Sequence, residues 1–126
     1  MSLAHVTLAT RDVPRSSEFF TTTLLWRLIE RPANIDRPAA WLEICPGQEL
    51  HLVEVQDFEP SPFEREFGRH IALFYPARDF AALKSRLIAH GAQLIDPLRE
   101  TPFERFFFQD PNGYVFEVID AERLGH

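Results

Sequence analysis

The chain has 126 residues, 45% of them hydrophobic and 25% charged, and its net charge is −6. This composition is typical of a globular domain, and a chain of this length is too short for two domains of usual size. The 13 basic residues are scattered among 19 acidic ones, which argues against a nucleic-acid partner. No apolar stretch is long enough to span a bilayer and no signal sequence precedes the first predicted strand, so we expect a cytoplasmic protein with no membrane partner.

The first half of the chain predicts a strand, a helix and three more strands. Residues 3–9 alternate between two kinds of side chain, as a strand with two different faces does. Pro14 suits a first helical turn, and Phe19 and Leu24 recur at helical spacing, which predicts a helix that packs both residues on the sheet. Three extended segments follow, at 27–31, 39–44 and 50–55.

The second half repeats this order after a polar segment that contains proline. A second helix is predicted over 78–90, with Leu83 and Leu87 on its apolar side and Gly91 at its end. Strands are expected at 69–74, 93–95, 105–109 and 114–119, and an exposed loop at 96–102. The sequence therefore predicts a single domain, 1–126, with module 1 at about 1–55, a linker at about 56–67 and module 2 at about 68–120.

Four residues capable of metal chemistry recur at matching places in the two halves. His5 and His70 stand 65 residues apart at the start of apolar runs, and His51 and Glu117 stand 66 residues apart in the last predicted strands. A two-fold relation between the halves would bring all four together. We therefore expect a divalent metal site with His5, His70 and Glu117 as ligands and His51 as the fourth. In an alternative interpretation, His51 supports the ligands or carries a proton.

The predicted ligand set limits the chemistry of the ion. A buried Glu117 is costly unless a cation pairs with it, and a metal would supply that cation. Two histidines and one carboxylate suit Fe(II) and its neighbours when the substrate must also bind the metal. The cofactor is expected to be Zn, Ni, Mn or Fe(II), acting as a Lewis acid on vicinal oxygens.

Strand 105–109 has two different faces. Arg105 and Phe107 share one face, and we expect them to look into a cavity while Phe106 and Phe108 pack under the second helix. In the alternative, Arg105 pairs at the surface with a neighbouring glutamate, Glu100 or Glu104.

The first half offers counterparts to this strand. Trp41 and Glu43 share one face of the strand predicted at 39–44, and we expect this pair of positions to be the counterpart of Arg105 and Phe107, with Trp41 as a pocket wall or a core residue. Cys45 has no basic neighbour in sequence to activate it, so we expect a buried structural thiol. His90 is expected to interact with helix carbonyls, and His126 is a terminal residue outside the site.

Three segments carry a resemblance to known proteins: Ala4-His5-Val6-Thr7-Leu8, Gly68-Arg69-His70-Ile71-Ala72 and Phe107-Phe108-Gln109-Asp110-Pro111-Asn112-Gly113-Tyr114-Val115-Phe116-Glu117. In these segments the chain resembles the vicinal oxygen chelate superfamily of glyoxalases, fosfomycin-resistance and bleomycin-resistance proteins and extradiol dioxygenases. The resemblance implies an α+β fold, in which two βαβββ modules curl into an open half-barrel around the metal, and commonly a homodimer.

The resemblance also implies roles for individual residues. His5, His70 and Glu117 match the metal positions of the family, and His51 stands where glyoxalase I enzymes carry a Glu or Gln that also serves in proton transfer. His51 and Glu117 are thus the expected catalytic residues. The expected substrate contacts are Thr7, Trp41, Arg105 and Phe107.

The implied function is that of a metal-dependent enzyme acting on a small oxygenated molecule, first of all a glyoxalase-like lyase or isomerase. An Fe(II) extradiol-type dioxygenase and a non-catalytic protein that binds a small molecule such as an antibiotic are the alternatives. Ala9 and Val55 stand where glyoxalase I relatives place an Arg and an Asn for glutathione, so glutathione is not predicted. Thr7 supports a similarity to fosfomycin transferases. The residues of this chain that could bind a phosphonate in that case are Arg99, Arg105 and Arg123.

Overall fold

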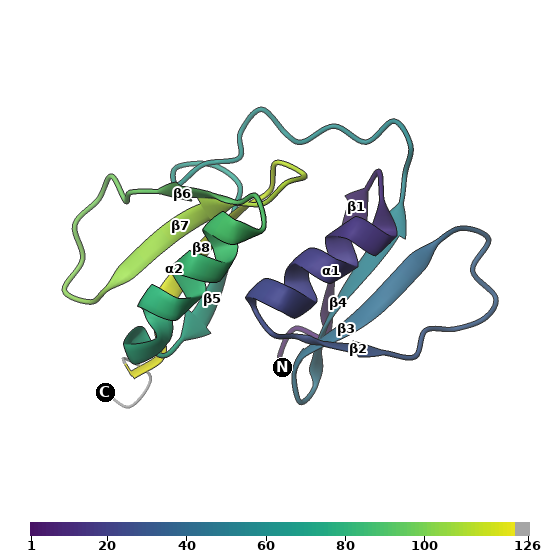
Figure 1. Ribbon diagram of the computed structural model, residues 1–126, viewed down its shortest axis with the longest axis horizontal. Coiled ribbons are helices and arrows are strands. Elements are labelled where there is room, and N and C mark those ends of the chain that lie inside the picture. The colour runs from purple at the N-terminus through teal and green to yellow at the C-terminus, as the bar shows by residue number, and fades with distance from the viewer. Residues whose placement is uncertain (123–126) are drawn as a thin grey trace. The chain divides into compact units, whose positions relative to one another are not determined.

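The computed structural model describes residues 1–122. The chain forms two compact units, Met1–Phe58 and a second one that begins at Glu59. The first contains β1 (His5–Thr10), α1 (Val13–Thr23), β2 (Arg27–Ile29), β3 (Ala39–Cys45) and β4 (Gln48–Glu54) (Figure 1). The second contains β5 (Ile71–Tyr75), the short 3-10 helix η1 (Ala77–Asp79), α2 (Phe80–Ala89), β6 (Gln93–Ile95), β7 (Arg105–Gln109) and β8 (Val115–Asp120). Both units are βαβββ modules, and the predicted α+β class is confirmed.

The two sheets have the same topology. Their strand orders are β1-β4-β3-β2 and β5-β8-β7-β6, so the first strand of each unit pairs with its last. That pair is parallel, and the other pairs are antiparallel. The predicted strands and helices agree with these bounds to within about two residues, except that His70 precedes β5 instead of lying in a strand. The repeat read from the sequence is therefore a repeat of structure.

Helix α1 begins and ends at residues suited to those places. Asp12 is its N-cap, and the Asp12 carboxylate accepts a hydrogen bond from the backbone N–H of Arg15. Pro14 lies in the first turn, where the missing N–H breaks no helical hydrogen bond. After the helix, Leu25 adopts a positive φ of 62°, which ends the helical path and turns the chain toward β2.

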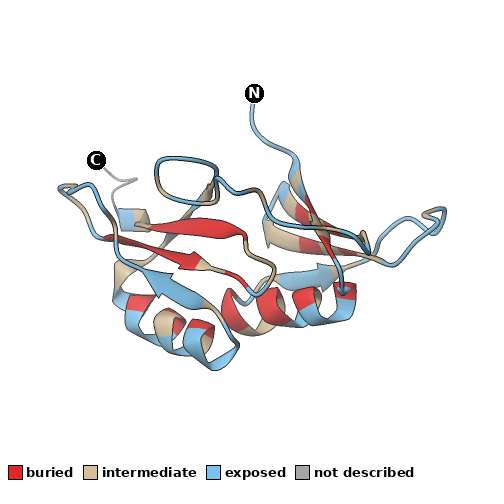
Figure 2. Cartoon of the chain, turned by 90° about the horizontal axis from the view of Figure 1, so that it is seen from above, coloured by how far each residue is buried: buried red, intermediate tan, exposed pale blue. Residues whose placement is uncertain are grey.

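In the first unit, α1 packs on one face of the sheet. Phe20 is fully buried, and the strand residues Leu8, Leu42, Leu50 and Leu52 are buried with it. Phe19 and Leu24 are also buried, as the helical spacing predicts. Figure 2 shows that buried residues lie on helices and strands, whereas loops are mostly exposed. Since side chains alternate along a strand, the other face of this sheet carries His5, Thr7, Trp41 and His51.

The second unit has an aromatic core between α2 and its sheet. Phe106 contacts Phe80 of the helix edge-on, at 5.1 Å between ring centroids, and Phe108 stacks on Phe116 at 5.0 Å. Leu83 and Leu87 are fully buried on the helix. Gly91 ends the helix region with a φ of +90°, as expected. Phe106 and Phe108 thus point toward the helix side, which leaves Arg105, Phe107 and Glu117 on the opposite face.

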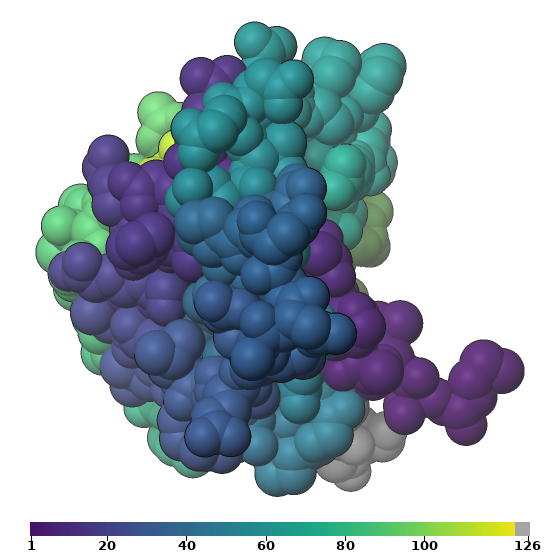
Figure 3. Space-filling view, turned by 90° about the vertical axis from the view of Figure 1, so that its right-hand side faces the viewer, coloured from purple at the N-terminus to yellow at the C-terminus, as the bar shows by residue number. Residues whose placement is uncertain are grey.

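The surface segments carry few regular elements. Residues 1–4 precede β1 and are exposed, and Figure 3 shows this purple end extending outward from the first unit. Among residues 1–122, no helix is long and apolar enough to cross a membrane.

Candidate functional site

The hydrogen-bond register places His51 and Glu117 at equivalent positions. His51 in β4 lies between Thr7 of β1 and Trp41 of β3, and Glu117 in β8 lies between Ala72 of β5 and Phe107 of β7. Trp41 and Phe107 are therefore counterparts, and each is the cross-strand neighbour of the predicted ligand in its unit.

The prediction that Trp41 and Glu43 together are the counterparts of Arg105 and Phe107 is wrong for Glu43. Glu43 pairs with Glu49 and corresponds to Gln109, whereas the counterpart of Arg105 is Ala39, because both lie two residues before the central aromatic residue. The mistake arose because parity along a strand gives a face but not a register.

The first unit holds a stack of three rings. The imidazole of His51 lies between the rings of Trp41 and His5, with centroid distances of 3.8 Å and 4.0 Å and interplanar angles of 5° and 15°. Ring nitrogens donate their lone pairs in the ring plane, so nearly parallel imidazoles do not direct them at one point. Binding of one ion by both His5 and His51 therefore requires one ring to rotate.

Glu49 is a partner of His51 that the sequence analysis missed. Its Oε1 lies 2.8 Å from Nε2 of His51, and the histidine side chain is only 12% exposed. A carboxylate in this position fixes the tautomer and orientation of an imidazole. The available signal was that Glu49 and His51 are two residues apart, and so on one face of the same strand.

The second unit brings His70 and Glu117 together. Nε2 of His70 lies 3.3 Å from Oε1 of Glu117, and Nδ1 of His70 lies 3.3 Å from the backbone carbonyl of Arg65. A carbonyl can only accept a hydrogen bond, so Nδ1 carries the proton in that contact. In the neutral ring, the lone pair of Nε2 then faces a carboxylate oxygen, which is also an acceptor. Such a pair of acceptors requires a cation between them, either a proton on His70 or a metal ion.

Arg105 contacts Glu117 on its other oxygen. Nη1 of Arg105 donates to Oε2 of Glu117 at 2.9 Å, and Nη2 donates to Oε2 of Glu66 at 3.1 Å and to the carbonyl of Arg99. The alternative interpretation, in which Arg105 pairs at the surface with Glu100 or Glu104, is wrong, because Arg105 forms buried pairs with Glu117 and Glu66. Glu66 is 39 residues from Arg105 in the chain, and no sequence pattern indicated that the two residues pair.

These contacts shift the pKa values of the paired groups. Burial alone would lower the pKa of Arg105, but hydrogen bonds to Glu117 and Glu66 outweigh it and the pKa is raised. Burial alone would raise the pKa of Glu66, but the N–H of Leu98, Arg105 and the N–H of Arg99 bind the carboxylate and its pKa is lowered. Arg105 and Glu66 are therefore both charged at neutral pH.

The remaining predicted site residues lie as follows. Thr7 is exposed on the same face as His51, and Phe107 is almost fully buried, with its ring 5.3 Å from that of His70.

The prediction that Cys45 is a buried thiol is wrong. Cys45 is exposed, because it ends β3 beside a β-bulge at the Pro46–Gly47 turn. At His90, it is the backbone N–H that donates to the carbonyls of α2. Arg123 and His126 lie outside the described residues.

The four predicted ligands therefore occur as two pairs, His5 with His51 and His70 with Glu117. Within either unit, the described residues contain no group of three or more His, Cys, Asp or Glu side chains placed to hold an ion. The convergence of both pairs on one metal stays a prediction.

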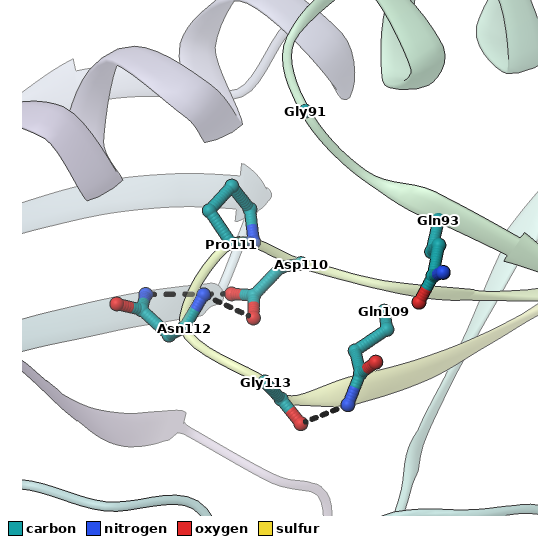
Figure 4. A pocket seen from close by; sticks show the side chains of 7 residues that line it. All are labelled: Gly91, Gln93, Gln109, Asp110, Pro111, Asn112 and Gly113. Atoms are coloured by element: carbon teal, nitrogen blue, oxygen red, sulfur yellow. Dashed lines mark hydrogen bonds between the residues drawn. The ribbon is translucent and has the colours of Figure 1, made fainter.

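A polar hollow of about 310 Å³ lies beside the turn between β7 and β8 and contains none of the predicted site residues (Figure 4). It is lined by Gly91, Gln93, Gln109, Asp110, Pro111, Asn112 and Gly113. The buried carboxylate of Asp110 accepts the N–H groups of Asn112 and Tyr114 at 3.0 Å and 2.8 Å. Burial raises its pKa to about 6. The turn sets the start of β8 and thereby the position of Glu117.

Comparison with known proteins points to the same family by two routes, a family model and a similar curated protein. The family model of the "Glyoxalase/Bleomycin resistance protein/Dioxygenase superfamily" matches residues 2–118. "Glyoxylase I 4" of Arabidopsis thaliana is 26% identical over 129 residues, which span 98% of this chain and 72% of the plant protein.

Solved structures share the fold. A glyoxylase/bleomycin resistance protein/dioxygenase domain from Frankia sp. EAN1pec has a TM-score of 0.77 at 23% identity, over 95% of this chain and 97% of that one. A point mutant of the fosfomycin resistance protein FosX from Listeria monocytogenes, complexed with Mn(II) and 1S,2S-dihydroxypropylphosphonic acid, has a TM-score of 0.80 at 18% identity, over 99% and 98% of the two chains.

Proposed function

Because the chain belongs to the Glyoxalase/Bleomycin resistance protein/Dioxygenase superfamily, we propose that it is a metal-dependent enzyme acting on a small molecule with vicinal oxygens. The reaction we favour is that of a glyoxalase-like lyase or isomerase. The superfamily name covers enzymes and resistance proteins alike, so membership supports the fold and the type of pocket, and the chemistry must come from the site residues. Mn(II) in the FosX relative supports a divalent ion, here Zn, Ni, Mn or Fe(II).

The arrangement of His70 and Glu117 is the observation that carries the proposal. Nδ1 of His70 is committed to the carbonyl of Arg65, so its Nε2 is the free ligand atom, and Oε1 of Glu117 lies 3.3 Å away. Two atoms that each bind one ion at about 2.1 Å stand roughly this far apart. The His70–Glu117 pair thus suits a divalent metal, and we propose His5 as its third ligand and His51 as its fourth.

Each group in the site has a role in the proposed reaction. The metal, when bound, would act as a Lewis acid that stabilises negative charge on a substrate oxygen. In the alternative in which His51 does not bind the ion, His51, oriented by Glu49 at 2.8 Å, would take a proton from the substrate and return it. Glu117 would hold the ion and serve as the second proton-transfer group. Thr7 and Trp41 are the proposed substrate contacts. Arg105 and Phe107, which the sequence predicted as contacts too, are buried beside Glu117 and His70 and would act on the substrate only through these residues.

Metal analysis of protein purified without chelator tests the site. We expect about one divalent ion per chain, and its loss in His70→Ala and Glu117→Ala. His90→Ala is the matched control, because His90 is an exposed histidine of the same unit that lies after α2. Retention of metal by both site variants would refute the proposed site. Retention by His51→Ala alone would leave His5, His70 and Glu117 as a three-residue site.

Two assays on the metal-loaded protein distinguish the candidate reactions. Isomerisation of thiol–methylglyoxal adducts with nickel, zinc or manganese is the expected activity. Oxygen uptake with catechols under ferrous iron would favour the dioxygenase instead. Absence of both, together with tight metal-independent binding of an aromatic ligand near Trp41 and Phe107, would favour a sequestering protein.

The proposed assembly is a homodimer. The outer strands of the two sheets are β1, β2, β5 and β6, and the last three expose the apolar side chains Leu28, Phe74, Leu94 and Ile95. Outer strands with exposed apolar residues are surfaces that a second chain can cover. Light scattering at micromolar concentration is expected to give the mass of a dimer, and a monomer would refute it.

A further inference from the structure

Arg105 is shared between two carboxylates that are almost as buried as itself. The side chains of Arg105, Glu66 and Glu117 are 2%, 8% and 9% exposed, and Arg105 lies within 3.1 Å of an oxygen of each glutamate. One guanidinium would be enough to balance the charge of Glu117. The second carboxylate leaves the trio with a net negative charge, so charge balance alone does not explain it.

Glu66 is itself anchored to the backbone. Its two oxygens accept the N–H groups of Leu98 and Arg99, at 2.6 Å and 3.1 Å. The carbonyl of Arg99 in turn accepts from Arg105. The guanidinium is thus held from one side by Glu66 and the loop at 98–99, and it presents its other Nη to Glu117. A planar guanidinium gripped in this way has little freedom to rotate.

The orientation of Arg105 leaves one of its own donors unsatisfied. Among the described residues, Nε of Arg105 is a buried atom without a hydrogen-bond partner. A buried donor without a partner destabilises the folded state, because it loses its hydrogen bond to water. Geometry that is kept in spite of such a cost is typical of functional sites, where position matters more than stability.

The neighbouring residue supports His70. The carbonyl of Arg65 contacts Nδ1 of His70, so consecutive residues, Arg65 and Glu66, control the two sides of the His70–Glu117 pair. The chain can make this tight turn because residue 68 is glycine. A Cβ on Gly68 would lie 2.2 Å from the carbonyl oxygen of Phe63, closer than any side chain tolerates.

We propose that Arg105 and Glu66 are positioning residues: Glu66 anchors Arg105, and Arg105 holds Oε2 of Glu117 so that only Oε1 faces Nε2 of His70. Glu117 is then presented to the ion as a one-oxygen ligand. The inference rests on the proposed function, since it takes Glu117 as a metal ligand. Its geometric part, the orientation of Glu117 against His70, holds in the metal-free protein as well.

The first experiment reads that orientation without metal. The imidazole ¹⁵N resonances of His70 are compared at pH 8.5 in the parent, Glu117→Gln and Arg105→Lys. Lysine keeps the charge but cannot bridge both carboxylates with a planar fork. We expect Arg105→Lys to displace the His70 resonances at least half as far as Glu117→Gln does. Arg86→Lys, at an arginine of the same unit that donates to Tyr75, is the control and is expected to displace them little.

The second experiment measures Co²⁺ binding by its visible absorption. Loss of a residue that orients a ligand typically weakens metal affinity about 10–100-fold. We expect at least tenfold weaker Co²⁺ binding in Arg105→Lys, with a changed band shape as Glu117 becomes free to bind through both oxygens. Glu66→Gln, which keeps the shape of the side chain, is expected to change both readouts in the same direction. It also serves as the test if Arg105→Lys does not fold.

The outcomes separate the two proposals. Unchanged His70 resonances and unchanged Co²⁺ affinity in a folded Arg105→Lys would overturn the positioning role while leaving the metal site intact. A parent protein that takes up no Co²⁺ would overturn the proposed function. In that case, the metal-free resonances still decide whether Arg105 orients Glu117.

Discussion

Glu54 and Asp120 perform the same task in the two units. Each lies at the end of the last strand, in register with the end of the first strand: Glu54 with Thr10 and Asp120 with Tyr75. Glu54 accepts the N–H of Val13 at the start of α1, at 3.2 Å, and Asp120 accepts the N–H of Ala77 at the start of η1, at 3.3 Å. A carboxylate at the N-terminus of a helical segment satisfies a free donor and interacts favourably with the helix dipole.

Loss of either carboxylate is therefore expected to destabilise the protein. Glu54→Ala and Asp120→Ala should each lower the free energy of unfolding by about 1 kcal/mol, as the loss of a helix cap does. Urea denaturation of each variant and of the parent measures this difference in the free energy of unfolding. Asp57→Ala is the control, because Asp57 is exposed. Equal stability of all three variants would mean that the two contacts contribute nothing.

The burial of Asp110 predicts a pH dependence of stability. Its pKa in the folded protein is about 6, above the ordinary value of 3.8, so the folded state binds the proton more tightly than the unfolded state. The parent should therefore lose stability as the pH rises from about 4 to about 6, by an amount on the order of 2–3 kcal/mol.

Asp110→Asn should lack this loss. The amide oxygen can still accept the N–H groups of Asn112 and Tyr114, and it has no charge to bury. Urea denaturation of both proteins between pH 4 and pH 7 gives the difference in free energy of unfolding at each pH. A difference that does not change with pH would show that Asp110 ionises in the folded protein as easily as in the unfolded chain.

Gly113 is expected to tolerate substitution less well than Gly47. Both have positive φ, +100° and +87°, but a Cβ on Gly113 would lie 2.8 Å from Cγ of Pro60, whereas nothing lies within 4 Å at Gly47. Gly47→Ala should cost about 1–2 kcal/mol of stability, from the backbone alone. Gly113→Ala should cost more.

A double mutant separates the two effects at Gly113. Pro60→Ala removes the crowding atom, so the penalty of Gly113→Ala in that background should fall toward the penalty of Gly47→Ala. The measurement is thermal or urea denaturation of the four proteins. An unchanged penalty would mean that the contact with Pro60 relaxes without cost.

Glu49 offers a test of proton transfer that leaves the metal in place. In Glu49→Gln, His51 keeps a neutral partner at Nε2 but loses the negative charge beside it. We expect metal content to stay unchanged and kcat to fall about 10–100-fold, with little change in KM. Glu30→Gln, at an exposed glutamate of the same unit, should leave kcat unchanged. Loss of metal in Glu49→Gln would instead make His51 a ligand that depends on Glu49.

Local patterns in the sequence were enough to predict the elements and their faces. Strict alternation in β7 assigned Phe106 and Phe108 to the helix side and Arg105 and Phe107 to the other, because successive side chains of a strand point in opposite directions. The matching positions of His51 and Glu117 followed from the repeat, since equal spacing in equal topologies gives equal register.

Only the tertiary structure decided which groups pair. The cation beside Glu117 is Arg105, and the second partner of Arg105 is Glu66, from a segment that the sequence indicated only as a linker. Such pairing depends on how a segment folds back over a distant strand, and no periodicity in the sequence records it. Glu49 stands beside His51 and Cys45 is exposed for the same reason: alternation assigns a face, whereas side-chain rotamers, bulges and turns set contact and exposure.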